Sequence, residues 1–279
     1  MPVPESEGGM VWHGFLIDIT DRRRAEQEIR SLNIDLERRV AERTSELEIQ
    51  HREMEAFTYS VSHDLKAPLR GIDGYSRLLE SDHADRLDEE GRFFVSMIRQ
   101  ATAHMGELID DLLAYSRVER GRPKLGPIAV EPVLASVVDA VAAEAAAGSI
   151  ALRSEVEPGL TVLGEREGLG LALRNLLDNA IKFTAGRPDR ITEIGARRAQ
   201  GHALFWVRDN GPGFDMRYHD RIFEIFQRLH RAEDYPGTGV GLAIVRKAVE
   251  RMHGKVWAES AKGAGATFWI RLPEAQAAA

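Results

Sequence analysis

The spacing of apolar residues predicts that the first part of the chain is one long, polar helix. Residues 21–55 are rich in charge, contain neither Gly nor Pro, and carry sparse apolar residues in a heptad rhythm. The step from Leu36 to Val40 falls out of phase, as a stutter in a coiled coil would. Helices this polar are marginal alone, so we expect a parallel dimeric coiled coil, with a solvated single helix as the alternative.

Two helical stretches with stronger apolar stripes follow. The first includes residues 57–70, FTYSVSHDLKAPLR, and runs on to a polar break, SDHADRLDEEG. The second is expected from about Leu87 to Arg117. Its apolar residues alternate spacings of four and three: Phe94, Ile98, Ala101, Met105, Leu108, Leu112 and Tyr115. Such a stripe is typical of a bundle seam, and two copies of this helix pair would form a four-helix bundle.

The pattern changes to mixed α/β beyond residue 128, after a segment, 120–127, whose composition is that of a linker. We expect helices at 131–147, 166–183 and 240–252, and an irregular stretch at 210–239. Strands are expected at 150–157, 160–163, 191–199, 202–209, 255–260 and 265–273. The tail from residue 274 is expected to be disordered.

The N-terminus reads as a strand, MVWHGFLIDIT, that ends at residues 18–20. A lone strand is not stable, so we interpret residues 1–20 as the end of a preceding domain, with a disordered head as the alternative.

Composition narrows the class of protein. A length of 279 residues allows two domains, and a net charge of −7 disfavours nucleic acid or an anionic membrane as a partner. The absence of cysteine excludes disulfides, thiolate metal sites and cysteine catalysis. The sequence has no run of about 18 apolar residues and no signal-peptide pattern, so we expect a soluble, cytoplasmic chain.

His63 is the first candidate for chemistry. Val61 and Leu65 each lie two residues away, about 200° around a helix, so the imidazole should point to water. Asp64 can accept the Nδ1–H and leave Nε2 with a free lone pair. Pro68 should bend the helix just beyond the histidine. Taken alone, a solvated histidine on a helix is usually one without a function, so this stretch needs support from the rest of the chain.

Asn175, Asn179 and Lys182 lie at i, i+4 and i+7 on one face of the helix at 166–183, opposite its leucines. An amide oxygen suits Mg²⁺, and a lysine suits a phosphate. The alternative to a ligand site is an ordinary solvent-exposed helix face.

Three glycine-rich segments complete the candidates. Asp209 precedes Asn210-Gly211-Pro212-Gly213 and could accept from an exocyclic amine such as that of adenine, although D-N-G is also a common turn. Residues 237–241, GTGVG, open a helix, where free N–H groups favour an anion. Residues 263–267 form a further glycine turn. Each segment is weak evidence alone, but their order downstream of His63 is a strong signal.

In this order the segments resemble the boxes of a sensor histidine kinase of a two-component system. FTYSVSHDLKAPLR is similar to the phospho-acceptor box, and RNLLDNAIKFT to the Asn-rich box of the Bergerat-type ATP-binding fold. DNGPGF, FEIFQRL, GTGVGLAIV and GAGATF match its glycine and phenylalanine boxes, so the resemblance covers about 50–273. The segment after FQRL most resembles kinases linked to PAS or phytochrome-type sensors, and GFLIDITDRRRAE resembles the end of a PAS domain.

The resemblance implies an α+β architecture: a coiled coil, a two-helix hairpin that dimerises into a four-helix bundle, and an α/β sandwich that binds ATP. The implied domains are a PAS-like remnant (1–20), a coiled-coil signalling helix (21–56), a dimerisation and phospho-acceptor domain (57–120), a linker (121–127), an ATP-binding domain (128–273) and a tail (274–279).

The resemblance also implies roles for individual residues. His63 would accept the phosphoryl group, with Asp64 orienting it or acting as its base. Asn179 would be the Mg²⁺ ligand, with Asn175 and Lys182 near the phosphates of ATP. Asp209 would bind adenine, and Gly211 and Gly213 would shape that pocket. Phe223 and Phe226 would anchor the lid over the nucleotide. The phosphate end of the lid and the start of the next helix would contribute Gly237, Thr238, Gly239, Gly241 and Leu242. Phe223 and Phe226 could equally be core aromatics, and Arg228, His230 and Arg231 are more loosely placed lid cations.

The implied function is autophosphorylation of His63 by ATP, followed by phosphoryl transfer to an aspartate of a cognate response regulator. The protein would act as a homodimer whose activity is controlled by an upstream sensor domain. Family members that also dephosphorylate their partner usually carry Thr or Asn four residues after the histidine; Ala67 stands there, so we expect weak phosphatase activity. The alternatives are a silent dimeric scaffold that docks a response regulator and an ATPase of the same fold that drives conformational change. The stimulus is not encoded in these residues.

Overall fold

The computed structural model describes residues 3–4, 10–11, 17–119, 123–229, 234–235 and 237–275. It separates into two units, residues 1–57 and 58–279, and each unit is considered on its own. No helix among the described residues is both long enough and apolar enough to cross a membrane.

The first unit contains most of helix α1 (Thr20–Asp82), the long helix expected from the charge pattern. Asp18 accepts a hydrogen bond of 2.9 Å from the backbone N–H of Thr20. Ile29, Leu32 and Leu36 are each about 60% exposed in the single chain, which leaves the heptad stripe uncovered. The expected N-terminal strand is only partly correct. β2 (Met10–Val11) pairs antiparallel with β1 (Val3–Pro4), but residues 17–19 are irregular and Thr20 already begins the helix, while residues 12–16 lie outside the described part.

The second unit begins with a helical hairpin. The end of α1 is joined through the short 3₁₀ helix η1 (Ala84–Arg86) to α2 (Glu89–Glu119), and Pro68 lies inside α1 without ending it. Leu69 of α1 packs with Ile109 and Leu113 of α2 in a small apolar cluster.

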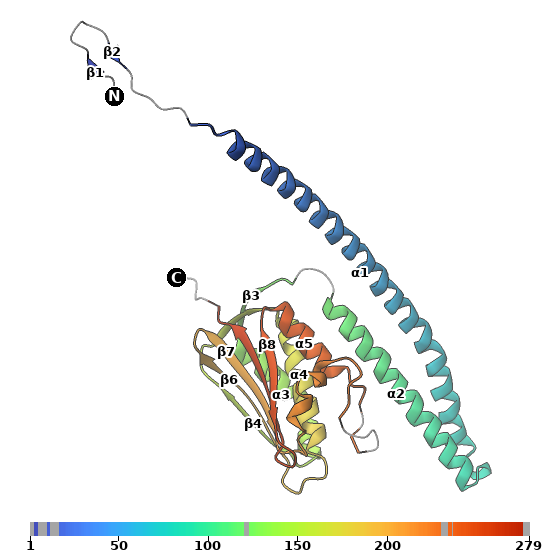
Figure 1. Cartoon of the computed structure of the whole chain (residues 1–279). Coiled ribbons are helices and arrows are strands. Elements are labelled where there is room, and N and C mark those ends of the chain that lie inside the picture. Colours follow the sequence, from blue (N-terminus) through green and yellow to red (C-terminus); the bar gives the residue numbers. More distant parts are fainter. Residues whose placement is uncertain are drawn as a thin grey trace. The chain divides into compact units, whose positions relative to one another are not determined.

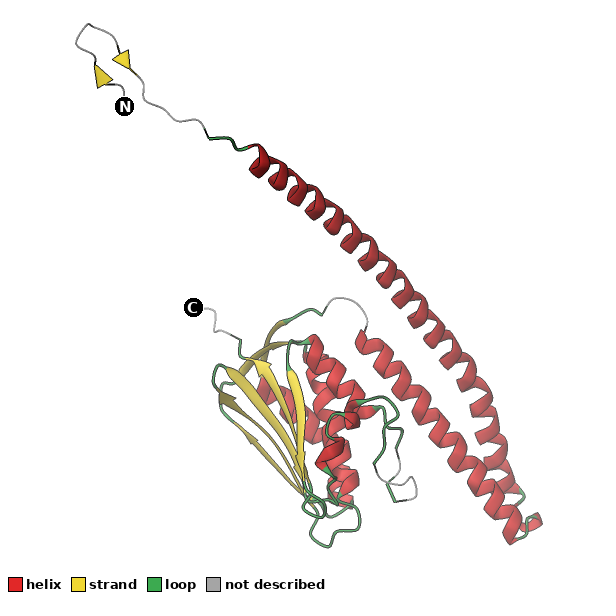
Figure 2. Cartoon of the chain, in the orientation of Figure 1, coloured by secondary structure: helices red, strands yellow, loops and turns green. Residues whose placement is uncertain are grey.

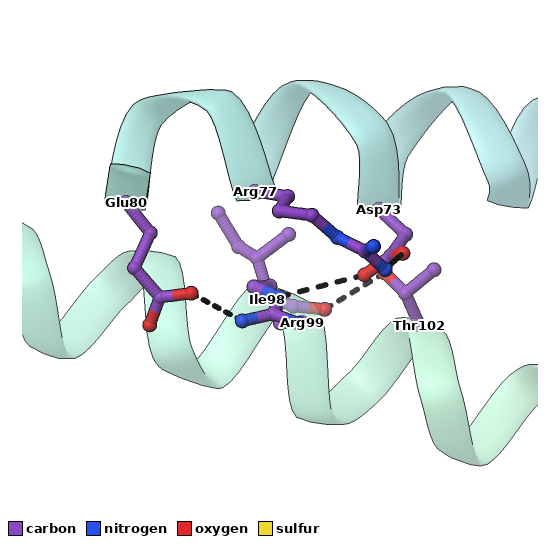
Figure 3. A network of polar contacts seen from close by, with 6 residues as sticks. All are labelled: Asp73, Arg77, Glu80, Ile98, Arg99 and Thr102. Carbon is purple, nitrogen blue, oxygen red and sulfur yellow. Dashed lines mark hydrogen bonds and ion pairs between the residues drawn. The ribbon is translucent and has the colours of Figure 1, made fainter. Parts of the chain in front are cut away.

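A charged network joins the two helices of the hairpin near its turn, as Figure 3 shows. Arg99 of α2 contacts Asp73 at 3.5 Å and also pairs with Glu80, both on α1. Asp73 in turn pairs with Arg77 at 2.9 Å. Partly exposed pairs of this kind contribute little stability each, but the shared arginine fixes how the two helices are aligned along their length.

The stripe expected to form the seam of α2 is not the one that packs inside the hairpin. The buried residues lie one position later in each case: Val95, Thr102, Ile109, Leu113 and Ser116. Phe94, Ile98 and Met105 of the expected stripe are 45–52% exposed in the single chain. Two helices have room for only one shared seam, so the larger apolar stripe remains open on the surface.

An α/β sandwich forms the rest of the unit. Its five-stranded sheet has the order β4 (Ala151–Val156), β6 (Ile191–Ala199), β7 (His202–Asp209), β9 (Ala266–Pro273) and β8 (Lys255–Ser260). β4 runs parallel to β6, and the other neighbours are antiparallel. Figures 1 and 2 show α3 (Val130–Ala147), α4 (Arg166–Phe183) and α5 (Gly241–Arg251) on one side of this sheet.

Alternation of apolar and polar residues explains the central strands. In β7, Ala203, Phe205 and Val207 are buried against the helices, whereas Leu204 and Trp206 point to the other face. The loop between β6 and β7 is Gln200-Gly201, both with positive φ, as a tight two-residue hairpin requires. The apolar face of α4 packs beneath the sheet and puts its polar face on the opposite side.

Three expectations outside the five-stranded sheet need correction. The tail is not disordered from residue 274, because Glu274 forms a β-bridge with Val162 and the N–H of Ala275 donates to the carbonyl of Thr161 at 3.0 Å. The segment 120–127 is not linker throughout, because β3 (Gly126–Ala129) pairs antiparallel with β5 (Thr161–Gly164). Proline and glycine argue against a strand. Pro127 is tolerated because β3 pairs with β5 along one edge, and a residue on an unpaired edge needs no backbone N–H for pairing. The irregular stretch 210–239 also contains two short 3₁₀ helices, η2 (Met216–Tyr218) and η3 (Arg221–Phe223).

Candidate nucleotide-binding and phospho-acceptor sites

A cavity of about 530 Å³ opens over the polar face of α4, between the Asp209 segment and the loop before α5. This volume suits a nucleotide-sized ligand. The cavity is lined by these residues named from the sequence: Asn175, Asn179, Lys182, Asp209, Gly213, Arg228, Gly237, Thr238, Gly239, Gly241 and Leu242. Residues more than 60 positions apart in the sequence therefore meet at one site.

The polar side chains of α4 form the floor of the cavity. Asn175 donates back to the carbonyl of Leu171 at 2.9 Å, and its Oδ1 lies where a side chain at Gly241 would collide with it. Lys182 donates to Oδ1 of Asn179 at 3.1 Å. Burial and the nearby Arg228 guanidinium lower the pKa of Lys182, against the opposing effect of the Asp111, Asp178 and Glu107 carboxylates. The floor therefore brings one ammonium group and two side-chain amides together, a combination that suits phosphate and a divalent cation.

Asp209 is a buried carboxylate at the opposite end of the cavity. Only 5% of the residue is exposed, and burial raises its pKa to about 6. The backbone N–H groups of Gly211 and Ala266 donate to it and partly offset that rise. Its own hydrogen bonds are thus few, and it can accept another from a ligand's amine.

The glycines before α5 let the backbone come close to this floor. A Cβ at Gly241 would lie 2.9 Å from Oδ1 of Asn175, and one at Gly237 would lie 3.0 Å from Nζ of Lys182. Gly237 and Gly239 both have positive φ. The free N–H groups at the start of α5 therefore lie near the ammonium group of Lys182, where an anion is favoured.

The structure separates the two phenylalanines expected to anchor a lid. Phe223 is buried and packs edge-on against Phe268, whose side chain lines the cavity. Phe226 is 59% exposed, does not line the cavity and has a positive φ. Its backbone N–H donates to the carbonyl of Gly239 at 3.0 Å. Phe226 is therefore neither a side-chain anchor nor a core aromatic in this structure.

Arg228 and Gly211 also differ in their placement. Arg228 lines the cavity and donates to the carbonyl of Tyr235 at 2.8 Å. Gly211 is buried and supports Asp209 from behind without lining the cavity. The other two candidate cations, His230 and Arg231, lie outside the described residues.

His63 stands on the surface of α1, outside the residues that line the cavity. Its side chain is 73% exposed, and Nδ1 lies 3.2 Å from Oδ1 of Asp64. With Nδ1 protonated, the imidazole donates to Asp64 and keeps Nε2 free toward solvent. Val61 and Leu65, expected to be buried, are 37% and 43% exposed in the single chain, so water reaches both sides of this helix.

Two family models match the segments that carry these sites. Residues 53–121 match the His Kinase A (phospho-acceptor) domain, and residues 164–276 match the histidine kinase-, DNA gyrase B- and HSP90-like ATPase. The first match contains His63 and the second contains the whole polar face of α4. The chain belongs to the sensor histidine kinase family.

Several characterised histidine kinases and phytochromes resemble this chain. Cyanobacterial phytochrome A from Nostoc sp. is 37% identical over 84% of this chain and 30% of its own length. Sensor protein DivL from Caulobacter vibrioides is 33% identical over 93% of this chain and 32% of its own length. The chain thus spans less than a third of the length of these curated relatives.

A solved structure agrees with this assignment. Full-length ShkA, crystallised in complex with AMPPNP, superposes with a TM-score of 0.60 at 32% identity, over 80% of this histidine kinase and 46% of its own chain. The helical region followed by an α/β domain is therefore the architecture of a known member of the family.

The sequence did not predict three features of the site. Glu107, Asp110 and Asp111 of α2 also line the cavity, and Thr238 donates a hydrogen bond to Asp111. The ring of Tyr235 packs 5.0 Å from that of Phe183. Arg187 braces the Asp209 segment from outside the cavity. No periodicity marks these residues, because their roles depend on which distant segment folds against them.

Proposed function

We propose that this chain is an ATP-dependent protein-histidine kinase that phosphorylates its own His63. The observation that carries the proposal is that one unit of the structure contains both a solvent-facing histidine paired with Asp64 and a cavity into which every nucleotide-box segment converges. The two matched family models support the same combination of acceptor and ATP-binding domain.

Asp209 and the loop before α5 account for the two ends of ATP. Ionised Asp209 accepts a hydrogen bond from the exocyclic amine of adenine, while the N–H groups at the start of α5 and the ammonium of Lys182 receive the phosphates. The buried apolar wall near Phe268 gives the base a dry surface. The binding of AMPPNP by ShkA supports a nucleotide of this type.

Mg²⁺ would be held by Asn179 together with phosphate oxygens of the nucleotide. The fit is supported by the donor type, since Asn179 lines the cavity and its Oδ1, an oxygen ligand suited to Mg²⁺, accepts a hydrogen bond from Lys182. No cluster of three or more His, Asp or Glu side chains that could hold a metal alone occurs among the described residues, which agrees with a metal bound partly through substrate. The metal supplies neutralisation of charge on the transferring phosphoryl group.

The chemical step uses neutral His63 as the nucleophile. Its Nε2 lone pair forms a bond to the γ-phosphorus while the bond to the β–γ bridging oxygen breaks, and ADP leaves with that electron pair. Asp64 accepts the hydrogen bond from the protonated Nδ1 of His63 and stabilises the positive charge that develops on the imidazole ring. Because His63 lies outside the lining of the cavity, the ATP-binding domain of this or the partner chain must approach it during turnover.

The remaining steps involve partners. The exposed stripes on α1 and α2, including Val61, Leu65, Phe94 and Ile98, suit a second copy of this chain in a four-helix bundle. An aspartate of a cognate response regulator then receives the phosphoryl group, in the cytoplasm. Residues 21–56 act as a coiled coil that couples the bundle to an upstream sensor domain, with residues 1–20 as the end of a PAS-like domain.

A labelling experiment tests this function. The chain is incubated with Mg²⁺ and γ-labelled ATP, and the labelled protein is then exposed to acid and to alkali. We expect label that is lost in acid and kept in alkali, as for phosphohistidine. A chain that binds ATP but acquires no label would instead be a silent scaffold, and rapid ATP hydrolysis without label would favour an ATPase that drives conformational change.

A further inference from the structure

Two loops meet behind the carboxylate of Asp209. The first loop, residues 210–213, follows β7, and the second loop, residues 261–265, precedes β9. The N–H of Gly263 donates to the carbonyl of Pro212 at 2.6 Å. Gly265 has a φ of +86°, and any Cβ there would collide with the carbonyl oxygen of Asp209. The loops therefore touch through their backbones, with no side chain between them at this point.

Each loop region supplies one hydrogen-bond donor to Asp209. The N–H of Gly211 comes from the first loop, and the N–H of Ala266 comes from the residue that directly follows the second. The direction in which the carboxylate faces the cavity thus depends on how the two loops are placed relative to each other.

Arg187 joins both loops through one guanidinium group. Its Nε donates to the carbonyl of Asn210 at 2.8 Å, and Nη2 donates to the carbonyls of Gly211 at 3.1 Å and Gly263 at 2.6 Å. Charge-assisted bonds from a planar guanidinium are strong and directional. Arg187 lies in the connection between α4 and β6 and does not line the nucleotide cavity.

We propose that Arg187 is a positioning residue that sets the base specificity of the nucleotide site, because it holds the two loops so that Asp209 faces the exocyclic amine of adenine. The inference rests on the proposed ATP site and adds to it a residue outside the cavity that controls which base is accepted. Ala266 is paired with Asp209 in the sheet, but without the guanidinium the Gly211 donor is no longer tied to the loop before β9, and the contact of Asp209 with the amine weakens. The phosphate end, on α4 and before α5, is unaffected.

Arg198 provides a matched control within the same domain. It also donates to several acceptors on separate segments: Glu157 at 2.7 Å, Glu274 at 2.8 Å and the carbonyl of Gly159 at 2.8 Å. These acceptors lie outside the residues that line the nucleotide cavity. Replacing Arg198 removes a similar set of bonds and reports the effect of lost stability alone.

The experiment compares two nucleotides by calorimetric titration of the whole chain. ATP carries the amine at position 6 of the base, and inosine triphosphate carries a carbonyl oxygen there. We expect the wild type to prefer ATP strongly. In Arg187→Ala, ATP affinity should fall about tenfold, as for loss of a buried hydrogen bond, while inosine triphosphate affinity changes little. Arg198→Ala should keep the wild-type ratio of the two affinities.

Each outcome decides something specific. A wild-type ratio in Arg187→Ala, or an equal loss for both nucleotides, would make Arg187 a structural residue only and overturn the inference while leaving the ATP site intact. A wild type that binds no ATP would remove the proposed function and the inference with it. If thermal unfolding shows that Arg187→Ala does not fold, Arg187→Lys decides. Lysine keeps the charge but reaches fewer carbonyls, so its ratio should lie below that of the wild type, and an unchanged ratio would again overturn the inference.

Discussion

The backbone N–H of Gly211 donates a hydrogen bond of 2.8 Å to Oδ1 of Asp209. This bond and a second one from Ala266 favour the ionised carboxylate, yet burial dominates and raises its pKa to about 6. Asp209 therefore titrates just below neutral pH, where most carboxylates are already fully ionised. Both ATP binding and the stability of the ATP-free protein should depend on this group.

ATP affinity should fall as the pH is lowered through about 6. Only the ionised form of Asp209 has both oxygens available as acceptors for the adenine amine. Calorimetric titration between about pH 5 and about pH 8 measures the effect, which should approach tenfold per pH unit below the pKa. The Asp209→Asn variant should bind ATP weakly at every pH in this range. An affinity that is flat in the wild type would show that Asp209 does not contact the amine.

Without nucleotide, Asp209 should destabilise the protein at neutral pH. Its folded-state pKa lies above the unfolded value of 3.8, so the folded state binds the proton more tightly. The protonated form of Asp209 therefore stabilises the folded state. This contribution to the free energy of unfolding is fully present well below about pH 3.8 and is lost as the pH rises through about 6, a change of about 3 kcal/mol.

The measurement that isolates this effect is the difference in free energy of unfolding between the wild type and Asp209→Asn. From about pH 4 to about pH 8 the difference should move against the wild type by about 2.5 kcal/mol, because asparagine does not titrate and the rest of the change falls below about pH 4. If the difference stays constant across that range, the pKa of Asp209 is not raised in the folded protein.

Asn179→Ala should lower the rate of autophosphorylation at least about 100-fold while the protein stays folded. The side chain lies on the polar face of α4 at the cavity, so its loss removes an oxygen ligand without opening the core. The rate is measured with γ-labelled ATP over a range of Mg²⁺ concentrations. Glu167→Gln, on the exposed first turn of the same helix, is the control and should keep the wild-type rate. A wild-type rate in Asn179→Ala would remove the metal role.

Ala67 should make this kinase a weak phosphatase. It lies one helical turn beyond His63 on nearly the same face of α1, and it is exposed, but a methyl group cannot hold a water for attack on an aspartyl phosphate. Ala67→Thr should speed the decay of a phosphorylated response regulator several-fold and leave autophosphorylation unchanged. Rapid decay with the wild-type kinase would show that another group holds the water.

Local sequence patterns predicted the elements of the ATP-binding domain closely. β6 and β7 have the expected bounds, and α4 has the expected bounds because its two faces differ sharply in polarity. β3 was missed because Gly126 and Pro127 are typical of linkers, and only its partner β5 reveals a strand. Which stripe of α2 packs within the hairpin was also not predictable, since both stripes keep helical spacing.

The candidate site was predicted where residues act from regular elements. Asn175, Asn179 and Lys182 meet the cavity because helical spacing alone puts them on one face. Phe226 was misplaced because it lies in an irregular segment, where sequence gives no direction for a side chain. Arg187 was missed because its three acceptors are backbone carbonyls, and backbone acceptors leave no trace in the sequence.

In the proposed reaction, His63 accepts the phosphoryl group from ATP bound in the α/β domain of this or the partner chain. The most direct test is autophosphorylation of His63→Gln beside the wild type, with ATP affinity measured on the same samples. His63 is exposed and does not line the cavity, so we expect no label in the variant and an ATP affinity within about twofold of the wild type. Equal labelling of both proteins would show that the acceptor is another residue.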